Sequence, residues 1–154
     1  EDAPKCPDYI GPVSIARTSD GRGRGLFSTR NISAGDIIIV SNAFATSYND
    51  THSIELYTKI SNTVKESPRA LQQYYSLAGY GCPDDLGVPD VTLFDPNLPF
   101  PGNGCDPQEN LEIDEKRIAH ILNVNSFEGD LGGFEGENKT STKLNGLWLL
   151  PSFI

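Results

Sequence analysis

Several residue types are scarce in this sequence of 154 residues: it has no methionine, one tryptophan, two histidines and three cysteines. The cysteines form no Cys-x-x-Cys pair, and together with the histidines they give no recognisable zinc-binding spacing. No apolar run approaches the roughly 18 residues that a membrane-spanning helix requires. The composition therefore predicts no metal site, no membrane partner, and reduced thiols in an intracellular protein of the nucleus or the cytoplasm.

Positive charge is missing from one long internal segment. Between Ala70 and Glu115 there is no lysine, arginine or histidine, although this segment holds nine of the 21 acidic residues. The other 12 acids balance the 12 lysines and arginines, so the formal net charge of −9 lies in this segment. Such a surface repels nucleic-acid phosphates and attracts a basic protein tail. A solvated acidic loop without a partner is the simpler interpretation.

The stretch that stands out is GRGRGLFSTRNISAGDIIIV, residues 21–40. Its three alternating glycines allow close approach to a ligand and offer backbone N–H groups to an anion. The sequence of 26–29 and 37–40 predicts two strands, the second buried, joined by a turn at 32–36. A P-loop or a dinucleotide fingerprint requires a helix after the glycines, and a kinase glycine loop requires a lysine in the next strand. We therefore predict a glycine loop that leads into a β-hairpin, with a ligand-free turn as the alternative.

Apolar residues at helical spacing predict three helices, with N-caps at Ser53 or Thr51, at Ser67 and at Asp114. Pro68 suits the first position of the second helix, and Gly79 is expected to end it. The residues expected to face the core are Ile54, Tyr57, Ile60, Val64, Leu71, Tyr74, Tyr75, Ala78, Ile118, Ile121 and Leu122.

The remaining segments predict short strands and loops. Alternation at 13–16 predicts a strand that pairs with the one after the glycines. Residues 42–49 are expected to leave the sheet, and 128–145 to form a loop. The proline-rich 81–110 predicts an irregular insertion, and 146–150 a strand with Trp148 in the core.

Three stretches resemble the SET domain, the fold of many protein-lysine methyltransferases. Residues 21–40 resemble the opening of that domain, and LNVNSF at 122–127 resembles the Asn-x-Asn-Ser/Ala-Phe segment of its SMYD-like branch. GLWLLPSFI at 146–154 resembles the strand that leads into the family's Asn-His-Ser-Cys motif. The three occur in the family's order, and the nearest likeness is to fungal SET proteins that often carry TPR repeats.

The resemblance implies an α+β fold of SET type, with short strands, small sheets and an inserted helical segment. It divides the chain into an extended lead-in at 1–12, a first SET segment at 13–48, a helical and acidic insertion at 49–112, and a continuing SET segment at 113–154. The Asn-His-Ser-Cys motif would follow directly after Ile154. We therefore expect an incomplete fragment whose strands at 37–40 and 147–150 lack partners until a missing C-terminal SET segment completes them.

The implied activity is transfer of a methyl group from S-adenosylmethionine to a lysine of a protein, histones and basic tails included. By resemblance, the residues that contact this donor are Arg22, Gly23, Arg24, Gly25 and Asn125. Helix C-capping is the alternative role of Asn125. The resemblance places the catalytic motif and the tyrosines of the lysine channel beyond Ile154, so we expect no catalytic residue here and no activity from the chain alone.

Two other classes of protein stay open. One is a non-catalytic SET-like scaffold that binds a protein through its acidic insertion. The other is a secreted glycoprotein, which would explain the missing initiator methionine and the three Asn-x-Ser/Thr sequons at Asn31, Asn49 and Asn138.

Overall fold

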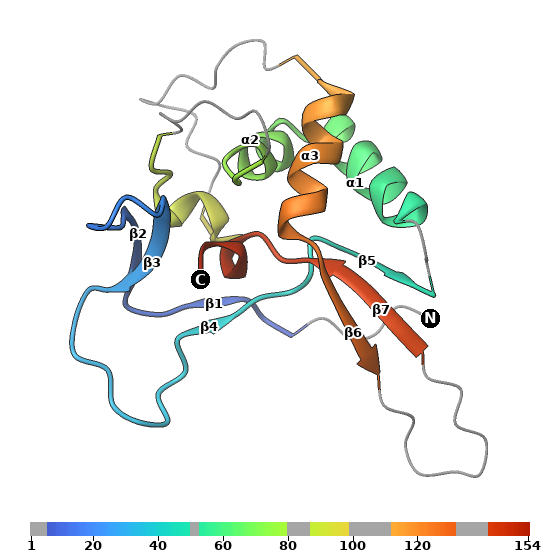
Figure 1. Ribbon diagram of the computed structural model, residues 1–154. Helices are drawn as coiled ribbons and strands as arrows, with labels where there is room; N and C mark the ends of the chain where they lie inside the picture. The colour runs from blue at the N-terminus through green and yellow to red at the C-terminus, as the bar shows by residue number, and fades with distance from the viewer. Residues whose placement is uncertain (1–5, 50–52, 80–86, 99–111, 132–141) are drawn as a thin grey trace, which may run out of the picture.

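The computed structural model describes residues 6–49, 53–79, 87–98, 112–131 and 142–154. These residues form three α-helices and small antiparallel sheets of two or three strands, so the predicted α+β class is confirmed. Figure 1 shows the helices gathered above the small sheets. Cys82, Cys105, Asn138, Thr51 and much of the predicted acidic insertion lie outside the described residues.

The helices begin close to where the sequence predicts them. They are α1 (Ile54–Glu66), α2 (Pro68–Tyr75) and α3 (Glu115–Asn125). The Ser67 hydroxyl accepts a hydrogen bond from the backbone N–H of Ala70, and the Asp114 carboxylate caps α3 in the same way. Ser53 stands at the N-cap of α1, but its side chain makes no capping hydrogen bond and its φ is 54°.

The helices bury their apolar faces against one another. Tyr74 is fully buried and donates a hydrogen bond of 2.8 Å from its hydroxyl to the carbonyl oxygen of Ile118 on α3. The predicted core-facing residues of α3 are all buried. Two predicted core residues are wrong, because Ile54 is 66% exposed and Ala78 is exposed beyond the end of α2. In α1 the buried face instead includes Leu56, one helical turn before Ile60.

The glycines close a different hairpin from the predicted one. Strand β2 (Val13–Arg17) pairs with β3 (Arg24–Ser28), as expected, and Gly21 and Gly23 lie in the turn between them. The predicted hairpin between 26–29 and 37–40 does not form. Strand β4 (Ile39–Val40) instead pairs with β1 (Tyr9–Ile10) in the lead-in. After β3 the chain therefore crosses to the lead-in and does not turn back onto β3.

The predicted buried strand at 37–40 is therefore only half correct. Ile37 and Ile38 are 63% and 40% exposed, and the strand begins at Ile39. The predicted turn before them is confirmed, because Gly35 has a φ of 94° and the Asp36 carboxylate accepts a hydrogen bond from the N–H of Ser33.

The third sheet contradicts three predictions. It has the order β5 (Ala45–Tyr48), β7 (Thr142–Leu147), β6 (Phe127–Leu131). Residues 42–49 were expected to leave the sheet and 128–145 to form a loop, yet both ranges contribute strands. The last predicted strand, expected at 146–150 without a partner, is the central strand β7 and ends at Leu147. The sequence did not predict β6, because glycine and charged residues are uncommon in strands. This strand forms through backbone pairing with β7.

Gly146 and Trp148 explain how β7 continues into the C-terminal segment. A Cβ atom at Gly146 would lie 2.6 Å from the indole ring of Trp148, so glycine lets this ring lie against the strand. Trp148 was predicted to be a core residue, but it is only half-buried and packs edge-on against Phe127. After it, the short 3₁₀-helix η2 (Leu150–Phe153) returns to the core, where Leu150 and Phe153 are buried.

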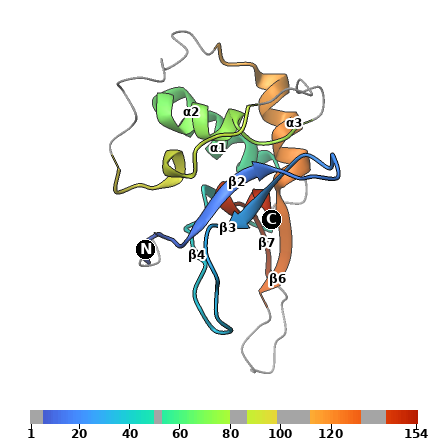
Figure 2. The ribbon, with the colours of Figure 1, turned by 90° about the vertical axis from the view of Figure 1, so that its left-hand side faces the viewer.

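The proline-rich insertion is attached to the body of the protein by a second 3₁₀-helix, η1 (Val91–Phe94). Asp90 caps η1 by accepting from the N–H of Thr92, and Leu93 and Phe94 are buried. Figure 2 shows the β2–β3 hairpin running across the molecule in front of the C-terminal segment, and β3 contacts η2. In the described parts of the chain, no helix is long and apolar enough to cross a membrane.

Candidate functional site

We call β2, β3 and the turn between them (residues 13–28) the glycine hairpin, and backbone hydrogen bonds close its turn. The backbone N–H of Thr18 donates to the carbonyl oxygen of Gly23 at 2.9 Å, and the N–H of Gly21 donates to the carbonyl oxygen of Thr18 at 3.3 Å. Gly21 and Gly23 have φ values of 74° and 111°, which favour glycine strongly over other residues. Gly21 and Gly23 are therefore required by the turn itself, whether or not it holds a ligand.

A carboxylate of the protein already occupies this turn. The Asp20 carboxylate accepts a hydrogen bond from the backbone N–H of Arg22 at 3.2 Å and another from its Nε at 2.6 Å. Hydrogen bonds from Thr18 and from Arg22 hold the pKa of Asp20 below its usual value. The turn can thus bind a carboxylate through a backbone N–H and a guanidinium, and Asp20 supplies one.

Arg24 points to other partners. Its Nη1 donates a hydrogen bond of 2.9 Å to the carbonyl oxygen of Gly87, and its guanidinium lies 5.2 Å from the centre of the Phe153 ring. Arg24 therefore joins the glycine hairpin to the segment before η1 and to η2. Gly25 lies in strand β3, where an added Cβ would make only ordinary contacts of 3.5 Å or more.

Asn125, the fifth predicted donor-binding residue, is 6% exposed at the end of α3. Its Nδ2 donates hydrogen bonds to the carbonyl oxygens of Ala78 at 2.6 Å and Ile121 at 2.8 Å. The bond to Ile121, in the last turn of α3, resembles the predicted capping role, and the bond to Ala78 links α3 to the segment after α2. These partners lie outside the glycine hairpin, and in the described part of the chain no hydrogen bond joins Asn125 to that hairpin.

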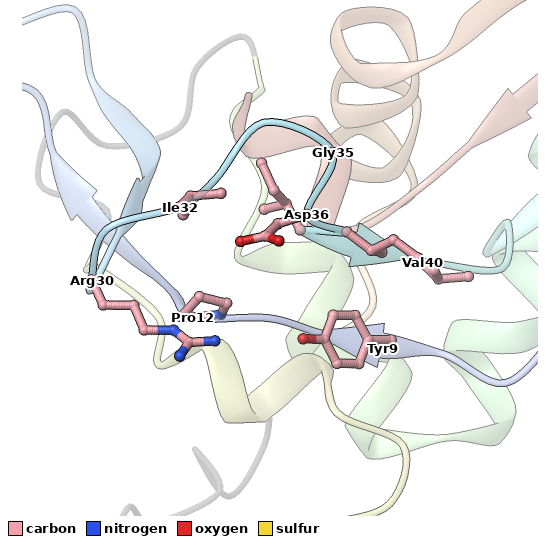
Figure 3. A pocket seen from close by; sticks show the side chains of 9 residues that line it. Tyr9, Pro12, Arg30, Ile32, Gly35, Asp36 and Val40 are labelled. Carbon is pink, nitrogen blue, oxygen red and sulfur yellow. The ribbon is translucent and has the colours of Figure 1, made fainter.

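Two cavities formed by the described residues lie away from the glycine hairpin. One of about 480 Å³ lies between β1, β4 and the loop that joins β3 to β4, and Figure 3 shows its lining. A second of about 270 Å³ lies between β4, η1 and the C-terminal segment. None of the five predicted residues lines either cavity. No motif in the sequence pointed to the larger one, although its exposed isoleucines follow the predicted turn at Asp36.

Metal binding finds no support in the described ranges, which hold no group of three or more His, Cys, Asp or Glu side chains arranged to bind an ion. No protein-family model matches this chain, and comparisons with curated proteins and with solved structures found no match. The likeness to SET domains therefore rests on the three stretches of sequence.

Proposed function

We propose that this chain is the donor-binding part of a SET-domain protein-lysine methyltransferase. The observation that carries the proposal is the likeness of three separate stretches to SET segments in the family's order. Contacts between them add support. Arg24, in the first stretch, packs on Phe153, in the third, and strand β6, which begins at the end of the second stretch, pairs with β7 of the third.

The chemistry required is methyl transfer from the sulfonium of S-adenosylmethionine to the neutral amine of a protein lysine. The methyl–sulfur bond breaks, a methyl–nitrogen bond forms, and S-adenosylhomocysteine and a proton leave. In the proposal the donor's carboxylate replaces that of Asp20 on the N–H and guanidinium of Arg22. Gly23 and Gly25 keep the backbone bare beside the donor, and Arg24 and Asn125 complete the site.

The lysine channel is proposed to come from an Asn-His-Ser-Cys motif and later tyrosines beyond Ile154. The chain alone should therefore bind the donor but transfer no methyl group. Sequencing the transcript past Ile154 tests this division directly. A reading frame without this motif and the tyrosines would contradict the methyltransferase.

Donor binding is tested by isothermal titration of S-adenosylmethionine and S-adenosylhomocysteine into the full chain. We expect Arg22→Gln to weaken binding about tenfold, as for removal of one charged hydrogen bond. Asp20→Asn should strengthen it, because the competing carboxylate is removed. Lys116→Gln, on the exposed surface of α3, is the matched control and should change nothing. No binding of either nucleoside, or equal effects of all three substitutions, would contradict the proposal.

A non-catalytic scaffold is the second candidate, and one observation favours it. The polar groups of the predicted donor site already have partners within the protein: Arg22 binds Asp20, Arg24 binds Gly87, and Asn125 binds Ala78. A scaffold would fold with these contacts in place and need no donor. The same titration separates the two candidates, because a scaffold binds neither nucleoside.

A further inference from the structure

The loop that joins β3 to β4 is built as an arch over the lead-in. At one end the backbone N–H of Thr29 donates to the carbonyl oxygen of Pro12 at 2.8 Å. At the other end the N–H of Gly11 donates to the carbonyl oxygen of Ile38 at 2.9 Å. We call residues 29–38 the arch. Compact loops with fixed, neighbouring ends are frequently functional.

Two glycines keep the arch in place. A Cβ atom at Gly11 would lie 2.7 Å from the carbonyl oxygen of Ile38, so a larger residue would push the two segments apart. Gly35 supplies the positive φ of the turn within the arch, where the N–H of Asp36 donates to the carbonyl oxygen of Ser33. Local geometry at these two glycines therefore keeps the arch close to the lead-in.

This hollow is the cavity of about 480 Å³, a size within the usual range of small-molecule sites. In Figure 3 the carboxylate of Asp36, the guanidinium of Arg30 and the hydroxyl of Tyr9 face the same space. The rest of the lining is mostly apolar, from Pro12, Ile32, Ile37, Ile38 and Val40.

Arg30 and Asp36 are both exposed residues at this cavity, and they do not pair with each other. No ion pair joins Arg30 to Asp36, and Arg30 has no hydrogen-bond partner among the described residues. By contrast, Arg22 and Asp20 on the neighbouring hairpin pair at 2.6 Å. Opposite charges that line one cavity without meeting suit a ligand that carries both charges itself.

The apolar lining gives such a ligand a second point of contact. Ile37 and Ile38 are 63% and 40% exposed, and Tyr9 is 46% exposed. Single exposed apolar residues are normal, but a group of them inside one hollow marks a binding surface. An apolar body beside the charged head would cover these side chains.

We propose that the cavity under the arch binds a free α-amino acid with an apolar side chain. Its carboxylate pairs with Arg30, its ammonium with Asp36, and its side chain covers Ile32 and Ile37. The site shares no residue with the glycine hairpin and does not depend on methyl transfer.

The test is a nuclear magnetic resonance titration of the full chain with L-leucine, L-leucinamide and N-acetyl-L-leucine. Leucinamide lacks the carboxylate and N-acetyl-leucine lacks the ammonium. We expect leucine to bind about tenfold more tightly than either analogue, because each analogue is missing one charge-assisted hydrogen bond. The shifted resonances should include those of Tyr9, Ile37 and Ile38.

Two substitutions assign each charge to its partner. Arg30→Gln should abolish the preference for leucine over leucinamide, and Asp36→Asn the preference for leucine over N-acetyl-leucine. Asparagine can still accept the hydrogen bond from Ser33, so the turn is kept. Arg22→Gln and Asp20→Asn, on the glycine hairpin, are the matched controls and should leave both preferences intact.

Equal affinity for the three compounds, a leucine preference that survives Arg30→Gln, or no binding at about 10 mM would each overturn the inference. S-adenosylmethionine carries the same charged head, so it is titrated into the Arg30→Gln variant as well. An unchanged donor affinity separates this cavity from the glycine hairpin. A loss of donor affinity would contradict the proposed donor site instead.

Discussion

The helical layer (α1, α2 and α3) and the arch use the same kind of side chain in opposite ways. Ile60 on α1 is fully buried, whereas Ile37 in the arch is 63% exposed. Tyr74 on α2 is buried with its hydroxyl bonded, whereas Tyr9 beneath the arch is 46% exposed. A β-branched or aromatic residue is thus buried only where a second element covers it.

The difference has a functional meaning. In the helical layer each buried side chain meets another element of the same chain, so burial there contributes to stability. At the arch the apolar side chains line a cavity, and in our proposal a bound amino acid would bury them. Substitutions in the first region should change the free energy of unfolding, and those in the second should change binding.

The largest expected effect comes from matched isoleucine substitutions. Ile60→Ala should destabilise the protein by about 2–5 kcal/mol, because it leaves a cavity in the core. Ile37→Ala should change the free energy of unfolding by less than about 0.5 kcal/mol, because this side chain is largely in water. Urea unfolding followed by circular dichroism measures both. Equal effects would remove the contrast between the two regions.

A second pair tests the three-stranded sheet β5-β7-β6. Gly146→Ala should cost about 1–3 kcal/mol, because the new methyl group collides with the ring of Trp148. Gly129→Ala, at a strand position with no atom within 4 Å of an added Cβ, is the control. We expect it to be nearly neutral in the same urea titration, and a similar loss at both positions would contradict the described packing.

A third prediction concerns alkaline pH. Burial, with smaller effects of Tyr75 and Tyr57, raises the pKa of Tyr74 above its ordinary value of 10.0. The unfolded chain therefore releases this proton first, so the stabilisation is complete below pH 10 and is lost as the pH rises above 10. The loss should be about 1.4 kcal/mol per pH unit.

Unfolding of wild type and Tyr74→Phe between pH 8 and about pH 11 measures this loss. Tyr74→Phe should be less stable at pH 8, because it lacks the hydrogen bond to Ile118, but it should lose less stability above pH 10. Tyr48→Phe, at a 55% exposed position on β5, should keep the wild-type slope. Identical slopes for all three proteins would refute the burial of the Tyr74 hydroxyl.

The smallest expected loss of stability comes from substituting the two serines at helix N-caps, Ser67 and Ser53. Ser67→Ala should cost about 1 kcal/mol, because the hydroxyl accepts from the N–H of Ala70 at 3.2 Å. Ser53→Ala should cost less, because Ser53 makes no side-chain cap. Thermal unfolding of the two variants ranks them, and a larger loss at Ser53 would reverse the assignment.

The sequence predicted well whatever depends on near neighbours. Ser67 and Asp114 were placed as caps and Gly35 as a turn residue, because each acts within a few residues of the chain. The sequence predicted strands poorly where their formation depends on a partner far away in the chain. Ala45, for example, pairs with Leu147. The same distinction holds for the candidate site. The turn around Gly23 is local and was predictable, whereas the hydrogen bond from Asn125 to Ala78 joins distant segments and was not.

The sequence by itself determined the α+β class, the three helices with two of their caps, and the pairing of β2 with β3 across the glycine turn. Only the tertiary structure decided that β4 pairs with β1, that β7 is a central strand, and that the arch encloses a cavity. Caps and tight turns are hydrogen bonds within a few residues, so local sequence specifies them. Strand pairing and cavities form between segments that are far apart in the sequence. A short apolar run such as 37–40 does not specify which other strand it will pair with.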